Sequence, residues 1–109
     1  MPTAVENYLE KYKAFQVAKG SLNKVTDAIL HVAAQIMAHR EKCYVKGLDP
    51  IPRILQEKGT ELDFTNWSTK NRFNALVVAY YDALGKTLQA WEALNFEERN
   101  GLQPPPQVD

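Results

Sequence analysis

Apolar residues recur at steps of three and four residues along three long stretches of this chain. An α-helix has 3.6 residues per turn, so this spacing places the apolar side chains of each stretch on one face. The sequence therefore predicts three long amphipathic helices, over residues 4–18, 22–44 and 69–94. In chain order, the residues with this spacing are Val5, Tyr8, Leu9, Tyr12 and Phe15; Leu22, Val25, Ile29, Val32, Ile36 and Cys43; and Phe73, Leu76, Val77, Tyr80, Leu84, Leu88 and Trp91.

Local signals mark where the first two helices begin and end. Thr3 is a preferred N-cap residue, and Glu6, three residues later, completes a capping box. Gly20 and Ser21 stand between the two helices, as a stop signal and as a new cap. Because the connection is so short, we expect these helices to form an antiparallel hairpin.

The segment that precedes the last long helix lacks helical spacing. Pro52 suits the first turn of a short helix, predicted over residues 53–58. Apolar residues then alternate with polar ones, as in a strand, at Leu62, Phe64 and Trp67. No partner strand is evident, so we interpret this part as a loop held by its aromatic side chains. The predicted fold class is all-α: a small bundle with a helical hairpin, a short helix and one long helix.

Length and composition indicate one globular domain. The chain has 109 residues, which is typical of a single domain, expected here over residues 1–102. Residues 103–109 are rich in proline and predict an exposed, flexible tail in the polyproline II conformation. Basic and acidic residues both number 13, and the resulting zero net charge argues against a dedicated nucleic-acid clamp. The single cysteine excludes an intramolecular disulfide framework.

The lack of a long apolar run favours a cytoplasmic protein. We expect its source to be a bacterium or a cell infected by a virus. Residues 1–6 lack the apolar run of a signal peptide. The longest uninterrupted apolar run, Ala75–Tyr81, is too short to span a bilayer, so we expect no membrane partner.

His39 and Cys43 are the pair whose spacing best suits chemistry. Four residues apart on one helix, they would share a face, and Zn²⁺ accepts imidazole and thiolate ligands. A structural zinc site needs two further ligands and the chain has one cysteine, so we interpret Cys43 as a packed residue and His39 as a boundary residue. Phosphate-binding glycine loops, nucleophile elbows and metalloprotease motifs are absent from the sequence. We expect no catalytic residues, no metal and no cofactor.

The start of the last long helix is a candidate site for anions. Trp67, Ser68, Lys70 and Arg72 combine an aromatic ring, a hydroxyl and two positive charges where a helix begins. Free backbone N–H groups and the helix dipole attract anions at such a place, and phosphate contacts need these residue types. The alternative is an ordinary helix cap with Trp67 packed on the core. A small nucleic-acid-binding protein is therefore the second functional hypothesis.

The last long helix is apolar over about half of its circumference, whereas a helix that buries one face needs an apolar arc of about 100°. The residues that exceed one contact surface are Val78, Tyr80, Tyr81 and Trp91. Tyrosine and tryptophan are enriched in the parts of interfaces that carry most binding energy. The alternative is that other segments of the chain cover them. The favoured hypothesis is a non-enzymatic interaction or adaptor module that forms a homodimer through this face, with a foreign protein as a further candidate partner.

Overall fold

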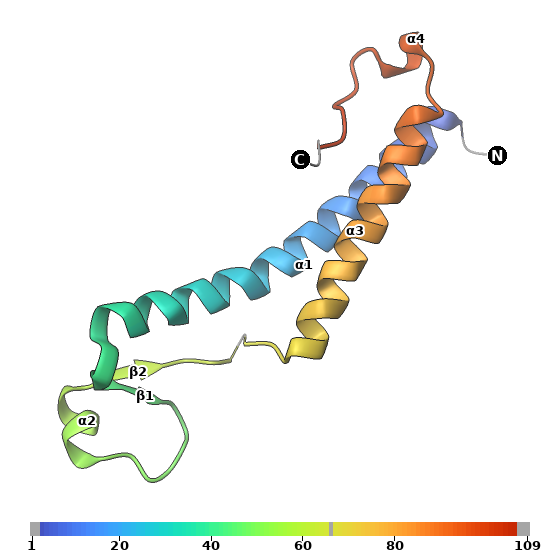
Figure 1. Cartoon of the computed structure of the whole chain (residues 1–109). Coiled ribbons are helices and arrows are strands. Elements are labelled where there is room, and N and C mark those ends of the chain that lie inside the picture. The colour runs from blue at the N-terminus through green and yellow to red at the C-terminus, as the bar shows by residue number, and fades with distance from the viewer. Residues whose placement is uncertain (1–2, 66, 107–109) are drawn as a thin grey trace. The chain divides into compact units, whose positions relative to one another are not determined.

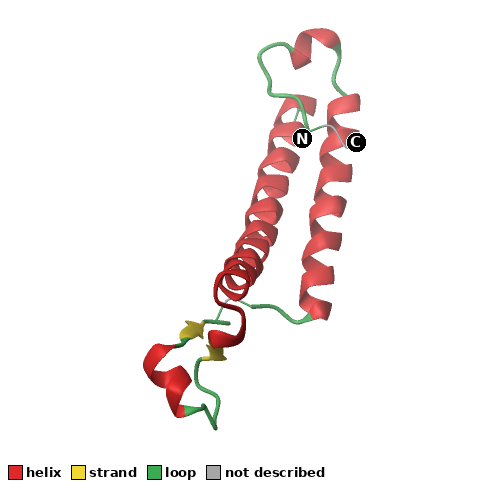
Figure 2. Cartoon of the chain, turned by 60° about the vertical axis from the view of Figure 1, so that its left-hand side comes forward, coloured by secondary structure: helices red, strands yellow, loops and turns green. Residues whose placement is uncertain are grey.

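The structure is a computed structural model that describes residues 3–65 and 67–106 (Figure 1). The described chain is 70% helical and 6% strand, which confirms the prediction of a mostly helical protein. The elements, coloured by type in Figure 2, are α1 (Ala4–His39), a 3-10 turn (Arg40–Lys42), β1 (Cys43–Val45), α2 (Arg53–Lys58), β2 (Thr60–Leu62), α3 (Lys70–Glu92) and α4 (Phe96–Arg99).

The chain divides into two compact units, and each is described by itself. Unit 1 comprises Met1–Leu22 and Lys70–Asp109, and unit 2 comprises Asn23–Thr69. The expectation of one helical domain over residues 1–102 stays a prediction.

The predicted hairpin between residues 4–18 and 22–44 is wrong, because α1 is one continuous helix that contains Gly20 and Ser21. A glycine inside a helix costs about 1 kcal/mol relative to alanine. Breaking the helix there would leave four carbonyl groups and four N–H groups without intrahelical partners, with only two residues to satisfy them. Continuing the helix is the smaller cost. The helix ends at His39 rather than at residue 44, and Arg40 follows with a positive φ of 20°.

The substitution Gly20→Ala tests this correction. A Cβ atom at Gly20 would meet no atom within 4 Å, so alanine fits the helix without strain. We expect the free energy of unfolding to rise by about 0.5–1 kcal/mol, measured by urea unfolding followed by circular dichroism. Gly47 has a φ of +82°, so Gly47→Ala is the control that should destabilise. A loss of stability in Gly20→Ala would instead indicate a helix stop at this position.

In unit 1, the first part of α1 packs antiparallel to α3. The Tyr8 ring lies 5.1 Å from the Trp91 ring, and the Phe15 ring lies 5.2 Å from the Tyr80 ring, centroid to centroid. Between these pairs, the fully buried Thr87 hydroxyl lies 3.0 Å from the carbonyl oxygen of Lys11 and 2.8 Å from that of Ala83. A polar side chain is tolerated at this buried place because its hydroxyl has partners.

The ends of unit 1 follow the predicted capping signals. The backbone N–H of Glu6 donates to the Thr3 hydroxyl over 3.1 Å. Asn95 and Glu98 form a reciprocal capping box at the start of α4, since each side chain accepts from the backbone N–H of the other residue. These contacts confirm Thr3 as the predicted helix cap and identify Asn95, a preferred N-cap residue type, as the cap of α4.

The sequence predicts an exposed proline-rich tail. The structure corrects this prediction, because the described part of the tail is partly covered. The Tyr8 hydroxyl donates to the carbonyl oxygen of Gln103. Pro104 is exposed, but Pro105 and Pro106 are half-buried. A hydrogen bond to a tyrosine on α1 holds this segment against unit 1, and residues 107–109 lie outside the described residues.

In unit 2, β1 and β2 form a two-stranded parallel sheet in which Val45 is the register partner of Leu62. The interpretation of this segment as a loop is therefore wrong for Leu62, which ends β2, whereas Phe64 and Trp67 follow in a loop, as predicted. The partner strand of β2 begins in residues that the sequence assigned to the end of the helix over 22–44, because Cys43 also fits helical spacing. The short helix over residues 53–58 is confirmed as α2.

Gly59 shows why the chain between α2 and β2 needs glycine. A Cβ atom at Gly59 would lie 2.5 Å from the carbonyl oxygen of Leu55 and 2.9 Å from that of Lys42. These backbone oxygens cannot yield as a flexible side chain would, so any larger residue would displace β2 from α2.

Candidate functional site: the outer face of α3

The four interface residues predicted on α3 separate into two pairs. Val78 is 58% exposed and Tyr81 is 56% exposed, one turn apart on the helix. Tyr80 is half-buried against the ring of Phe15, and Trp91 is half-buried against the ring of Tyr8. The structure thus places Tyr80 and Trp91 in the packing of unit 1 and leaves Val78 and Tyr81 facing outward.

The α3 helix carries two parallel stripes with heptad-like spacing. The inner stripe, which contacts α1 through Tyr80, Thr87 and Trp91, consists of Phe73, Val77, Tyr80, Leu84, Thr87 and Trp91. The outer stripe follows one residue later along the chain and consists of Asn74, Val78, Tyr81, Gly85, Leu88 and Glu92. Both stripes have the alternating steps of four and three residues that pack helices side by side. A helix with two such stripes is suited to contact two neighbouring helices at once.

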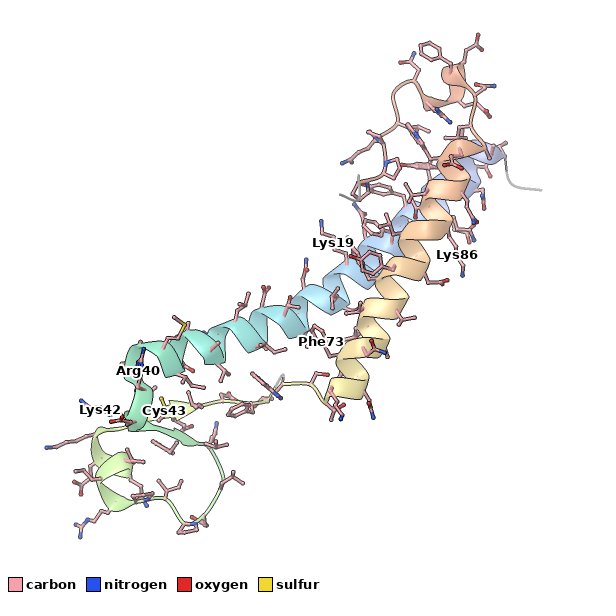
Figure 3. The ribbon with its side chains drawn as sticks, viewed as in Figure 1. Lys19, Arg40, Lys42, Cys43, Phe73 and Lys86 are labelled. Atoms are coloured by element: carbon pink, nitrogen blue, oxygen red, sulfur yellow. The ribbon has the colours of Figure 1, made fainter. Side chains whose placement is uncertain are left out.

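Exposure separates the two stripes. In the inner stripe Leu84 and Thr87 are buried, and every other member is half-buried. In the outer stripe no member is buried. Gly85 and Leu88 are half-buried, and the exposed members are Asn74, Val78, Tyr81 and Glu92. Phe73 and Lys86 leave α3 on different sides, which marks the inner and the solvent-facing directions (Figure 3). Val78 and Tyr81 of the outer stripe are therefore among the exposed large apolar side chains of unit 1, together with Leu9, Val17 and Phe96.

Two features of the outer face favour helix contact. The Tyr81 ring packs edge-on against the Tyr80 ring at 5.1 Å, so its position is set by the inner packing. A Cβ atom at Gly85 would meet no atom within 4 Å, so nothing in the described part of the chain requires glycine there. Glycine inside a helix costs about 1 kcal/mol. Its absent side chain leaves a notch on the outer stripe, beside Tyr81.

The predicted anion-binding residues divide between the two units. In unit 2, Trp67 is partly exposed and its ring packs edge-on against Phe64 at 4.9 Å. Ser68 is buried, and its hydroxyl donates to the carbonyl oxygen of Thr69 over 3.0 Å. In unit 1, Lys70 and Arg72 are exposed in the first turn of α3. The buried hydroxyl gives an anion little access, and the nucleic-acid hypothesis stays a prediction.

His39 and Cys43 do not share a helical face. The helix ends at His39, and Cys43 follows a 3-10 turn into β1, as Figure 3 shows for Arg40, Lys42 and Cys43. The half-buried Cys43 thiol lies 3.9 Å from the carbonyl oxygen of Gln35. Within the described residues no group of three or more His, Cys, Asp or Glu side chains could hold a metal ion. The spacing argument failed because the helix ends at His39, four residues before Cys43.

Unit 2 holds a polar hollow that sequence reasoning missed. It measures about 380 Å³ and is lined by Lys24, Asp27, Ala28, His31, Asp63 and Thr65. Two hydrogen bonds from Thr65, from its hydroxyl and from its backbone N–H, hold the pKa of the Asp63 carboxyl below its ordinary value. The Asp-x-Thr turn is a recognisable local signal. The approach of α1 to this turn depends on tertiary structure, so the hollow itself has no sequence signature.

Comparison with protein-family models, with curated proteins and with solved structures finds no match to this chain. No helix within the described residues is long and apolar enough to cross a lipid bilayer.

Proposed function

We propose that this protein is a non-enzymatic interaction module of the cytoplasm that forms a homodimer through the outer stripe of α3. The observation that carries the proposal is the exposure of Val78 and Tyr81, two large apolar side chains on one helical face. A contiguous apolar patch on a small protein is typical of an interaction site. The free cysteine is consistent with a reducing compartment.

The outer stripe is complementary to a second copy of itself. When two α3 helices pair antiparallel about a two-fold axis, Val78 of one copy lies opposite Tyr81 of the other, and the same pair forms twice. In that register Asn74 lies opposite Gly85. The larger side chain of each pair thus meets the smaller one, which is how facing helices interdigitate.

Charge at the helix ends supports the same orientation. Lys70 is the first residue of α3 and Glu92 is the last. Both lie near the outer stripe, since the helix turns by about 100° per residue. An antiparallel pair brings Lys70 of each copy close to Glu92 of the other, whereas a parallel pair would place like charges together. Surface pairs contribute only about 0–1 kcal/mol each, so they select orientation more than they set affinity.

The test is the double variant Val78→Lys with Tyr81→Lys. A symmetric contact covers four of these half-exposed side chains, and burial contributes about 1 kcal/mol for each. Their loss should raise the dimer Kd by about 1000-fold. Light scattering coupled to gel filtration should then report the 12.4 kDa chain mass, while the parent protein elutes at twice that mass. The far-ultraviolet circular dichroism spectrum should stay helical.

The matched control places two lysines on another exposed part of the same helix, as Ala75→Lys with Ala79→Lys, and should remain a dimer. Orientation is tested by charge reversal: Lys70→Glu alone should weaken the dimer, and adding Glu92→Lys should restore it. A parent protein that is monomeric at millimolar concentration overturns the proposal. So does unfolding of the Val78→Lys, Tyr81→Lys variant, because it would place these residues in the core.

A further inference from the structure

The proline-rich segment of unit 1 has a conformation that its sequence imposes. Gln103, Pro104 and Pro105 each precede a proline, which excludes the helical region of backbone space for them. Proline itself fixes φ near −65°. The segment is therefore extended, in or near the polyproline II conformation, and its carbonyl groups have no internal hydrogen-bond partners. Such a strand is a ready ligand for a surface that offers aromatic rings and a hydrogen-bond donor.

Unit 1 offers that surface at the end where α1 begins and α3 ends. The Tyr8 ring lies 5.9 Å from the Tyr12 ring and 5.1 Å from the Trp91 ring, centroid to centroid. Arg99 also holds Trp91 in place through two contacts. The Arg99 guanidinium lies 5.2 Å from the centroid of the Trp91 ring, and Arg99 Nη2 donates to the Trp91 carbonyl oxygen over 3.1 Å. Three aromatic rings are thus held in a defined arrangement on two helices.

The chain's own tail already contacts the cluster that contains Tyr8. The Tyr8 hydroxyl donates to the carbonyl oxygen of Gln103, which is a free acceptor of the polyproline II strand. Leu102 packs against the buried cluster that contains Tyr8, and Pro105 and Pro106 are half-buried. Figures 1 and 2 both show this segment returning from α4 to the end of the pair formed by α1 and α3.

We propose that Tyr8, Tyr12 and Trp91 form a polyproline-binding surface, that the segment 102–106 is its intramolecular ligand, and that a proline-rich segment of another protein binds there in its place. The occupant is identified by the segment that already lies there: residues 102–106, in which Leu102 packs on the cluster and the Gln103 carbonyl, directly before the prolines, accepts from the Tyr8 hydroxyl. A tethered ligand competes at an effective concentration in the millimolar range, so the tail limits access for an external strand.

The state of the Tyr8 phenol suits this role. Burial raises the pKa of Tyr8 above its ordinary value of 10.0, and the neighbouring Tyr12 raises it further. The hydroxyl therefore stays protonated, and available as a donor, at any physiological pH.

The experiment measures binding of a fluorescein-labelled peptide with the sequence Leu-Gln-Pro-Pro-Pro, by fluorescence anisotropy. The full chain with Pro104→Gly, Pro105→Gly and Pro106→Gly keeps the tail but removes its preference for polyproline II. This variant should bind the peptide at least tenfold more tightly than the parent protein, because its own tail competes less. A peptide with alanine in place of the three prolines should bind at least tenfold more weakly than the proline peptide.

The role of the hydroxyl is tested by adding Tyr8→Phe to the triple-glycine variant. Loss of one hydrogen bond should weaken peptide binding by about tenfold. Tyr81→Phe in the same background is the matched control and should leave binding unchanged. If the triple variant loses its helical spectrum, Pro105→Gly alone carries the same comparison.

Three results would overturn this proposal: equal peptide binding by the parent and the tail variants, equal binding of the alanine and proline peptides, or equal effects of Tyr8→Phe and Tyr81→Phe. The proposal stands apart from dimerisation. The Val78→Lys, Tyr81→Lys change added to the triple-glycine variant should leave its peptide affinity unchanged, because these residues lie on the outer stripe of α3.

Discussion

The substitution Phe15→Ala is expected to lower the free energy of unfolding by about 3–5 kcal/mol. Phe15 is 2% exposed, and its ring lies between those of Tyr12 and Tyr80, at 6.1 Å and 5.2 Å. Removing the ring deletes the contact that joins the middle of the α1 segment to α3 in unit 1. The gap would not be refilled by neighbouring aromatic rings, because both are held by their own helices. Urea unfolding followed by circular dichroism at 222 nm measures the loss.

The control is Val17→Ala, two residues further along the same helix. Val17 is 65% exposed, so its substitution should change stability by less than about 0.5 kcal/mol. Equal midpoints for Phe15→Ala and the parent protein would show that α1 packs on α3 through a different face.

The second large effect is expected from Leu62→Ala, at about 2–5 kcal/mol. Leu62 is the buried residue of β2, and its carbonyl oxygen accepts from the backbone N–H of Lys46 over 3.2 Å. A parallel sheet of two strands has little stability of its own, so the buried side chain must hold it in place. The sheet should open locally when that side chain is truncated.

Hydrogen exchange detects such local opening better than a global unfolding curve, because the two units need not unfold together. The amides of Cys43–Val45 should lose protection in Leu62→Ala, while those of α3 keep theirs. Ile54 is 68% exposed on α2, so Ile54→Ala should leave both sets of amides unchanged. Retained protection in β1 would contradict the observed strand pairing.

Much of the candidate surface could be predicted because helical spacing is a local property. The sequence places Val78 and Tyr81 at the edge of the apolar arc of α3, and both are exposed. The sequence could not separate them from Tyr80 and Trp91, because all four residues fall within the same broad apolar arc around the helix axis. That separation depends on which face of α3 meets α1, a choice that contacts such as Phe15 on Tyr80 decide.

The polyproline-binding surface shows the same limit in another form. Three consecutive prolines predict an extended tail from the sequence alone. Nothing in the spacing of Tyr8 and Gln103, which lie at opposite ends of the chain, indicates that a hydroxyl of one binds the carbonyl of the other. Contacts between residues so distant in sequence depend on the fold that brings them together.

Local interactions determined the helical content, the short helix over residues 53–58 and the caps at Thr3 and Asn95, because each depends on residues within one turn. The tertiary structure decided the continuity of α1 through Gly20 and the pairing of β1 with β2. A glycine penalty of about 1 kcal/mol is small compared with the packing and hydrogen bonds that a long helix gains. A strand has no local partner, so its existence depends on whether another segment of the chain can reach its edge.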